Sequence, residues 1–377
     1  MTRRLLFSLA LSSLTACNAI LGVDFEGRRR DSSDGVDGGE EMPPEGEEGD
    51  ASTPKEGGTS KDGSLEAAVE GGYLADLEKL AKLRVRVADA PAGLDKHFAS
   101  RSWMHWVDGA GHGHSLKPQD GTTRNIAKSF LDANDIVALH RLTPPADLSI
   151  ISGTDGQVLG TFHVSYPVAL DDGVLVFEDG APGMLEARVW RTSSPTMLGA
   201  SIGTVPSTVY PIGKTGNTAY LRQFSVPPKL FIVDIQTPSV TSIDFNVELQ
   251  AVSKITEGMV LTHVTGGTKF QLVRPTGVPV NLTAEIAAAK SNIPIADRLA
   301  YGAAATSGDW LFYSAQCGIL AFRYRDRRLV PIQLRTSEDD FFYNGVRVVQ
   351  SPRTVIFTSA KSLEGLWHVK VDSLLPP

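Results

Sequence analysis

Residues 311–315 read LFYSA, residues 318–326 read GILAFRYRD, and this strand, turn and strand pattern decides the fold. The pattern returns at residues 355–359, which read VIFTS, and at residues 365–372, which read GLWHVKVD. Short apolar runs rich in β-branched and aromatic residues, separated by glycine, proline and aspartate, are typical of β-strands. The C-terminal part of the chain is therefore predicted to repeat one β-hairpin unit.

Weaker copies of this unit occur throughout the chain after residue 83. They lie at residues 218–222 with 229–234, 258–263 with 269–273, 173–177 with 185–190, 135–139 with 147–151, and 102–107. The seven units begin near residues 103, 136, 174, 219, 259, 311 and 355, and the mean step is about 42 residues, a period typical of four-stranded propeller blades. The pattern resembles the generic blade of a β-propeller, and no dipeptide diagnostic of a named propeller family is present.

We therefore predict an all-β fold, a β-propeller of seven blades over residues 67–377. The last unit ends before it has an outer strand, and residues 84–88 (RVRVA) alternate polar and apolar side chains ahead of the first unit. These residues are predicted to complete the last blade and close the ring. A six-bladed ring and a pair of β-sandwiches are the alternatives. One short amphipathic helix is predicted at about Tyr73 to Leu83.

The N-terminus has the anatomy of an export signal. Arg3 and Arg4 precede an apolar run over residues 5–14, which is shorter than the roughly 20 residues that span a bilayer. Residues 14–17 read LTAC, which resembles the lipobox of bacterial lipoproteins. The resemblance implies a signal peptide over residues 1–16, cleavage before Cys17 and lipidation of Cys17. The following residue is Asn18 and not the aspartate of inner-membrane retention, so the outer membrane is the expected destination.

An acidic linker is predicted over residues 17–66. Residues 31–63 contain eleven acidic residues and two lysines, a net charge of −9, with almost no apolar residue, so we expect the segment to be disordered. The whole chain carries −7, and −9 without Arg3 and Arg4, so the remainder of the mature chain is neutral. A neutral domain lacks the basic footprint of nucleic-acid binding. With Cys17 lipidated, Cys317 is left as a small buried apolar side chain.

Two stretches are candidate sites. His105, His112 and His114 are predicted to form a metal site, because residues spaced by two on an extended segment share one face. The loop of residues 337–343 places acids before aromatics, and Asp339, Asp340, Phe341, Phe342 and Tyr343 are predicted to bind a sugar or a protein. Residues 199–203 (GASIG) match a nucleophile elbow, but a strand and a helix are not predicted to flank them, and we interpret them as a loop.

These features predict a lipid-anchored protein of the cell envelope whose propeller binds a protein, a glycan or another envelope component. No cofactor is expected, and the membrane is reached through the lipid anchor. The alternative is an extracytoplasmic hydrolase or lyase with its site at the mouth of the propeller channel. A scaffold that only stabilises an envelope complex is the third possibility.

Overall fold

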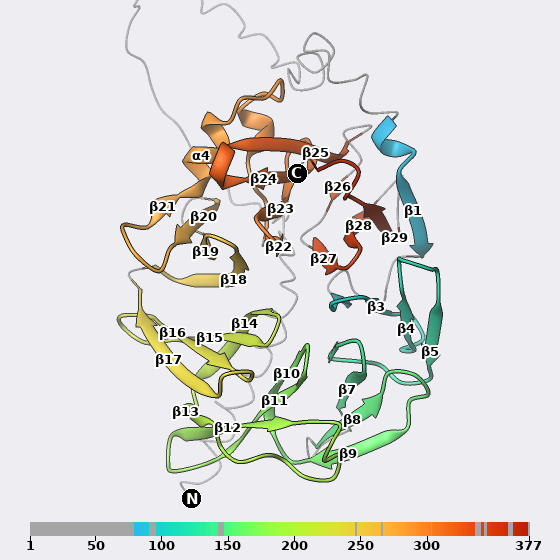
Figure 1. Cartoon of the computed structure of the whole chain (residues 1–377), viewed down its shortest axis with the longest axis vertical. Coiled ribbons are helices and arrows are strands. Elements are labelled where there is room, and N and C mark those ends of the chain that lie inside the picture. The colour runs from blue at the N-terminus through green and yellow to red at the C-terminus, as the bar shows by residue number, and fades with distance from the viewer. Residues whose placement is uncertain are drawn as a thin grey trace, which may run out of the picture.

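The computed structural model describes residues 79–89, 96–141, 147–245, 247–264, 267–302, 304–335, 341–342, 345–360 and 365–375. Cys17, the predicted signal peptide and the predicted acidic linker lie outside the described residues. Seven antiparallel β-sheets follow one another around a ring, so the chain is a seven-bladed β-propeller (Figure 1). The predicted fold class and blade number are confirmed.

The strands of each blade run in chain order from the centre of the ring outward. Blade 1 contains β2 (His97–Ala99), β3 (Met104–Val107), β4 (Gly113–Leu116) and β5 (Thr123–Ile126). Blade 2 contains β6 (Asp132–Ala133), β7 (Val137–Arg141), β8 (Leu148–Ser152) and β9 (Val158–Phe162). Blade 3 contains β10 (Ser165–Leu170), β11 (Gly173–Asp179), β12 (Met184–Trp190) and β13 (Gly203–Pro206).

The second half of the ring repeats this order. Blade 4 contains β14 (Val209–Thr215), β15 (Thr218–Gln223), β16 (Lys229–Asp234) and β17 (Ser239–Asp244). Blade 5 contains β18 (Leu249–Ile255), β19 (Gly258–Val264), β20 (Thr268–Val273) and β21 (Val280–Asn281). Blade 6 contains β22 (Ala305–Ser307), β23 (Trp310–Ala315), β24 (Gly318–Arg323) and β25 (Arg328–Leu334). We refer to the strands of each blade as A, B, C and D from the centre outward.

The two ends of the chain meet in blade 7. Its C-terminal strands are β26 (Phe341–Phe342), β27 (Arg347–Gln350), β28 (Arg353–Ala360) and β29 (Gly365–Lys370), and its outer strand is β1 (Arg84–Ala88). β1 runs antiparallel to β29, with Arg84 opposite Val369 and Ala88 opposite Leu366. The predicted closing strand is confirmed. Each inner strand contacts the inner strand of the next blade, and β27 contacts β2, so the ring is continuous.

The seven repeat units found in the sequence are the B–C hairpins of the blades. These strands are apolar on both faces because the blades stack against one another. Val355 and Phe357 of β28 pack on blade 6, in a cluster with Phe312, whereas the alternate residue Ile356 packs with Met104 of blade 1. The A and D strands are shorter or more exposed, which explains why their sequence signal is weaker.

A helical insertion between blades 5 and 6 accounts for the longest step in the repeat. It contains α4 (Leu282–Ala288) and the 3₁₀ helix η1 (Ala296–Arg298), and Asn281 caps α4 by accepting from the amide of Ala284. The guanidinium of Arg298 is buried and donates to five backbone carbonyls of the insertion: those of Ile286, Ala287, Ala289, Ser291 and Ile293. This side chain holds the segments of the insertion together. A second 3₁₀ helix, η2 (Tyr324–Asp326), links β24 to β25.

The structure also bears on the predicted helix at Tyr73 to Leu83 and on the predicted burial of Cys317. Of the helix predicted at Tyr73 to Leu83, only the last residues are described, and residues 79–81 are helical with Leu80 buried in the core between blades 5 and 6. Residues 73–78 lie outside the described part. Cys317 is a free, buried cysteine, and burial raises the pKa of its thiol to about 12. It is the apolar side chain that the sequence predicted.

Candidate binding face

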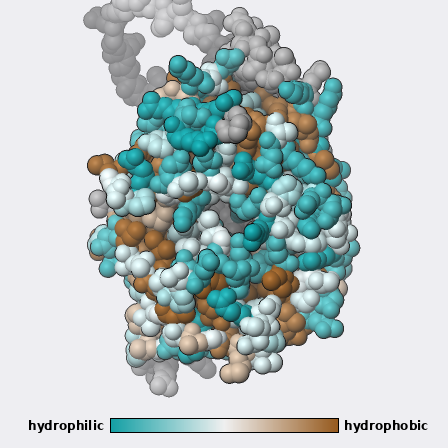
Figure 2. Space-filling model, in the orientation of Figure 1, coloured by the Kyte–Doolittle hydropathy of each residue, from teal (hydrophilic) through white to brown (hydrophobic). Residues whose placement is uncertain are grey.

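The antiparallel order of the blades gives the ring two different mouths. The turns between A and B strands surround one of them, which we call the A–B mouth. The connections from each D strand to the next A strand, together with the B–C turns, surround the other, which we call the D–A mouth. Figure 2 shows one face of the ring, where hydrophilic residues surround the middle and hydrophobic residues form separate patches.

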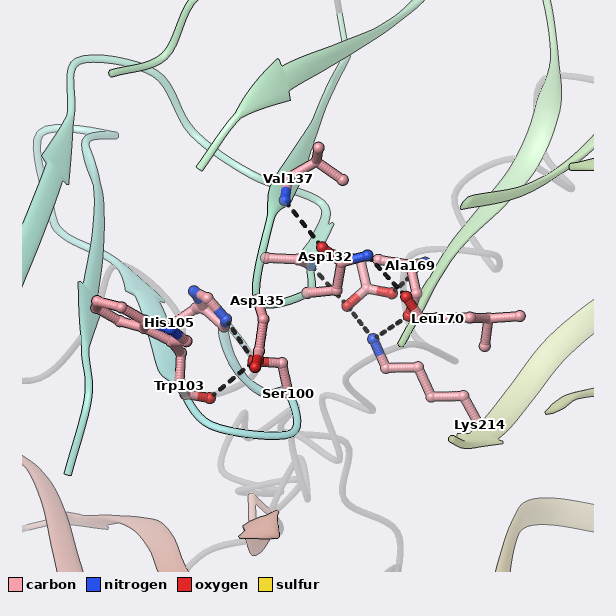
Figure 3. A network of polar contacts seen from close by, with 11 residues as sticks. Ser100, Trp103, His105, Asp132, Asp135, Val137, Ala169, Leu170 and Lys214 are labelled. Carbon is pink, nitrogen blue, oxygen red and sulfur yellow. Dashed lines mark hydrogen bonds and ion pairs between the residues drawn. The ribbon is translucent and has the colours of Figure 1, made fainter. Parts of the chain in front are cut away.

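A charged side chain links three blades near the A–B mouth (Figure 3). Lys214 of β14 donates through Nζ to Asp132 Oδ1 of β6 at 2.6 Å and to the carbonyl of Ala169 in β10 at 2.9 Å. Asp132 Oδ2 in turn accepts from the amide of Ala169 at 3.0 Å. A single ammonium group therefore bridges blades 2, 3 and 4, a structural role that holds their inner strands in register.

Ser100, His105 and Asp135 form a second part of this network (Figure 3), and they resemble a catalytic triad only in composition. Ser100 Oγ lies 2.6 Å from Asp135 Oδ1 and 3.0 Å from His105 Nε2, while His105 Nδ1 lies 2.8 Å from Ser115 Oγ. Burial, with the charge of Lys214 next, lowers the pKa of His105 to about 3, so the imidazole is neutral at pH 7.

The direction of the hydroxyl proton excludes base catalysis by His105 on Ser100 in this arrangement. A carboxylate only accepts hydrogen bonds, so Ser100 donates to Asp135 and has no further proton for the imidazole. His105 must then donate from Nε2 to Ser100 Oγ and accept at Nδ1 from Ser115. The imidazole therefore holds Ser100 in place and does not deprotonate it.

Backbone hydrogen bonds between successive turns tie the A–B mouth together. The amide of Asp171 donates to the carbonyl of Gly216, and the amide of Thr256 donates to that of Gly308. The carbonyl of Arg101 in blade 1 accepts from two amides of blade 7. Burial, followed by the charge of Asp135, raises the pKa of the Asp171 carboxyl. The polar groups of this mouth are largely engaged with one another.

The loops of the D–A mouth carry several exposed apolar side chains. They come from the connection between blades 1 and 2, from blades 4 and 5, and from the helical insertion: Leu131, Phe224, Val226, Val264, Ile295, Leu299 and Tyr301. Val226 is fully exposed, and Phe224 beside it is 51 % exposed. Because Phe224 and Val226 are exposed in the same turn, this mouth is the candidate binding face.

Arg222 and Tyr210 hold the Phe224 ring in place. The buried guanidinium of Arg222 lies 3.9 Å from the centre of the Phe224 ring, and it bonds to Glu248 Oε1 at 3.0 Å and to the carbonyl of Leu249. The ring also meets the edge of Tyr210 at a centroid distance of 5.5 Å. An exposed aromatic ring fixed by a buried arginine needs little ordering when a partner binds.

Tyr210 continues this aromatic row toward blade 3. Its ring lies 5.3 Å from that of Tyr166 at an angle of 72°. Tyr166 has a φ of 46°, a left-handed conformation that is costly for a non-glycine residue and clusters at functional sites. Tyr166, Tyr210 and Phe224 thus form a row of aromatic rings along the rim of the D–A mouth, from blade 3 to blade 4.

The three histidines predicted to bind a metal do not share one face. In the hairpin of β3 and β4, His105 is opposite Ser115 and Trp106 is opposite His114. Side chains of neighbouring residues on a strand point to opposite faces, so His105 and His114 are on different sides of the hairpin. His112 precedes β4 in the turn. Among the described residues, no group of three or more His, Cys, Asp and Glu side chains is arranged to hold a metal ion.

The acidic and aromatic stretch belongs by topology to the D–A mouth. It connects β25 of blade 6 to β27 of blade 7, and its Phe341 and Phe342 form β26, paired with Ala360 and Ser359 at the end of β28. Asp339, Asp340 and Tyr343 lie outside the described residues. The part of the stretch that is described therefore adjoins the candidate binding face.

Sequence reasoning missed the Phe224 turn, although it located the two strands around it. Residues 226–228 read VPP, a turn signal, and nothing in the sequence shows at which mouth this turn lies.

The loop at residues 199–203 leads into β13 and not into a helix, so it is no nucleophile elbow. In the part of the chain that the structure describes, no helix is long and apolar enough to cross a membrane.

Comparison with known proteins gives structural likeness only. No family model matches the chain, and no curated protein matches it. BamB from Moraxella catarrhalis is 10 % identical with a TM-score of 0.40, over 76 % of this chain and 97 % of that chain. PorZ, a surface component of the type-IX secretion system of Porphyromonas gingivalis, is 11 % identical with a TM-score of 0.44, over 75 % of this chain and 37 % of that chain.

The computationally designed protein Ika8 is 13 % identical with a TM-score of 0.43, over 76 % of this chain and 97 % of that chain. At these identities and TM-scores, the likenesses carry no information on ligand or activity.

Proposed function

We propose that this chain is a lipid-anchored protein of the cell envelope whose propeller binds a protein partner through the D–A mouth. Cys17 carries the lipid after removal of residues 1–16, and the acidic linker over residues 17–66 separates the domain from the membrane surface. The lipobox-like LTAC at residues 14–17 supports the anchor, and Asn18 supports the outer membrane as its location.

The observation that carries the proposal is the exposed pair Phe224 and Val226 at one mouth of the ring, with the Phe224 ring held over the buried Arg222. Burying a valine or phenylalanine side chain contributes about 1.5–3 kcal/mol. The fully exposed Val226 has no hydrogen-bonding group for a sugar hydroxyl, so it favours an apolar protein side chain over a glycan. Preorganised aromatic residues backed by arginine are typical of interface hot spots.

Site-specific photocrosslinking in the native envelope tests this function. A photoreactive amino acid replaces Val226 and, as a control away from the mouth, Val158, which is 52 % exposed on the outer strand β9, whereas Val226 is fully exposed. We expect one adduct of defined mass from position 226, none from position 158, and loss of the adduct in the Phe224→Asp background. Equal crosslinking at both positions, or none at position 226, would contradict the proposal.

The anchor has its own test. Radiolabelled palmitate is expected to label the chain, and Cys17→Ala is expected to abolish the label and to release the chain from the membrane fraction. Labelling that persists in Cys17→Ala would refute lipidation at Cys17. The alternative, a hydrolase or lyase at a channel mouth, predicts turnover on a panel of glycans or esters by the purified chain without a partner.

A further inference from the structure

The outer strand of blade 4 presents a regular free edge. β17 (Ser239–Asp244) is the last strand in the order of its sheet and lies at the outside of the ring (Figure 1). It pairs with β16 in continuous register, from Ser239 opposite Asp234 to Asp244 opposite Lys229. The side chains of residues 241–244 are all exposed. The edge that faces away from β16 is therefore the backbone of an unbroken, solvent-facing strand.

The hydrogen bonds at the end of this ladder show which backbone groups point outward. The amide of Phe245 donates to the carbonyl of Pro228 at 2.8 Å, in line with the register of the two strands. In an antiparallel pair, hydrogen-bonded and non-hydrogen-bonded residue pairs alternate. By this alternation, the N–H and C=O groups of Val240, Ser242 and Asp244 point away from β16. They are the donors and acceptors that a further strand can use.

The outer strands of the other six blades each carry a feature that opposes pairing at the edge. β5 and β21 have only four and two residues. β13 and β25 contain Pro206 and Pro331, and proline has no N–H to donate. β9 and β1 shift register against their neighbours, as at a β-bulge. Such features protect edge strands from unwanted partners. β17, with the sequence SVTSID, has six residues in register and neither a proline nor a basic residue.

The free edge of β17 ends at the side of the ring that carries the candidate binding face. Asp244 lies opposite Lys229, the residue with which β16 begins directly after the turn of residues 224–228. Asp244 Oδ1 and Lys229 Nζ are 3.6 Å apart, so this pair adds no net charge to the end of the edge. An extended segment paired with β17 therefore ends on the side where Phe224 and Val226 are exposed.

We propose that the protein partner of the D–A mouth adds an extended segment to β17 as a fifth strand of blade 4. The inference rests on the function proposed for the Phe224 turn and deepens it. In strand addition, main-chain hydrogen bonds supply the affinity and alternate side chains supply the specificity. Ile243 is 36 % exposed and lies on the opposite face of the strand from Ser242. We expect an apolar side chain of the added segment to pack beside Ile243.

Photocrosslinking from position 226 in the native envelope, repeated with variants of one edge residue, tests this mode of binding. Ser242→Pro removes an outward N–H and places the proline ring where the added strand lies. Pairing with β16 is kept, because this N–H does not face β16. We expect the yield of the adduct to fall about fivefold or more. Ser242→Ala is the matched control: it keeps the backbone N–H and removes only the hydroxyl, so its yield is expected to be unchanged.

Thr241→Lys is a second variant, which places a lysine on the edge without changing the backbone, and it is also expected to lower the yield. Circular dichroism and thermal unfolding of each purified variant show whether the fold is kept. An adduct that keeps its yield in the folded variants would overturn strand addition and leave the partner of the Phe224 turn in place. An adduct with the mass of two copies of this chain would also overturn it. Absence of any adduct from position 226 would instead refute the proposed function itself, so the two failures are distinguishable.

Discussion

The ammonium group that bridges three blades gives a sharp prediction for stability. Lys214 Nζ bonds to Asp132 Oδ1 at 2.6 Å and to the carbonyl of Ala169 at 2.9 Å, and the two charged side chains are 28 % and 16 % exposed. In Lys214→Met, the carboxylate of Asp132 keeps only the backbone amides of Ala133 and Ala169. Losing a charged partner in a partly buried site costs about 2 kcal/mol of unfolding free energy.

For a domain of roughly 300 residues, whose unfolding entropy is about 2.1 cal/mol/K per residue, this loss lowers the melting temperature by about 3 °C. Urea unfolding of Lys214→Met, Asp132→Asn and the double variant gives the coupling energy, which we expect to be about 1–2 kcal/mol. Lys229→Met is the control, because Lys229 pairs with Asp244 at 3.6 Å with both side chains exposed, and it is expected to cost less than about 0.5 kcal/mol. A coupling below about 0.5 kcal/mol, or an equal loss in the control, would refute the bridging role.

Two further predictions concern the closure of the ring and the buried histidines. A chain that starts at residue 90 lacks β1 and leaves the edge of β29 unpaired, so its midpoint of thermal unfolding is expected to be lower than that of the full chain. An unchanged midpoint would contradict closure by β1. Burial lowers the pKa of His105 to about 3 and that of His368 to about 4, whereas a histidine in the unfolded chain has a pKa near 6.5. The unfolded chain therefore binds more protons than the folded chain, and the free energy of unfolding falls as the pH drops below about 6.5. Between pH 7 and pH 4.5 the free energy of unfolding is expected to fall by about 2 kcal/mol for each histidine. His368→Gln should therefore make the pH dependence of urea unfolding less steep. An equally steep profile in this variant would contradict a lowered pKa of His368.

The repeat pattern was enough to predict the propeller because each B–C hairpin is buried on both faces. The LFYSA stretch at residues 311–315 became β23, and the VIFTS stretch at residues 355–359 lies within β28. The alternation in residues 84–88 predicted a strand that closes the ring, and β1 does pair with β29, although Val85 is 51 % exposed and only Val87 and Ala88 pack on the core. β6 contains only Asp132 and Ala133, too few residues for a periodic signal, and its place follows from topology alone.

The candidate sites depended on contacts that spacing does not reveal. His105 and His114 are separated by the register of one hairpin, and the register follows from the turn at residues 108–112. Asp108 contacts His112 and His114 because its carboxylate accepts the backbone amides that form this turn. Lys214 and Asp132 are 82 residues apart, and no local pattern links them. Phe224 becomes a candidate binding residue only when the ring shows which turns share a mouth.

The central claim is that the D–A mouth binds a protein through the Phe224 turn. Photocrosslinking from position 226 in the native envelope, compared with position 158, tests it most directly. The predicted result is a single adduct from position 226 that disappears in Phe224→Asp, while Val158→Asp leaves it unchanged. Adducts of equal yield from both positions, or an adduct that persists in Phe224→Asp, would contradict the claim.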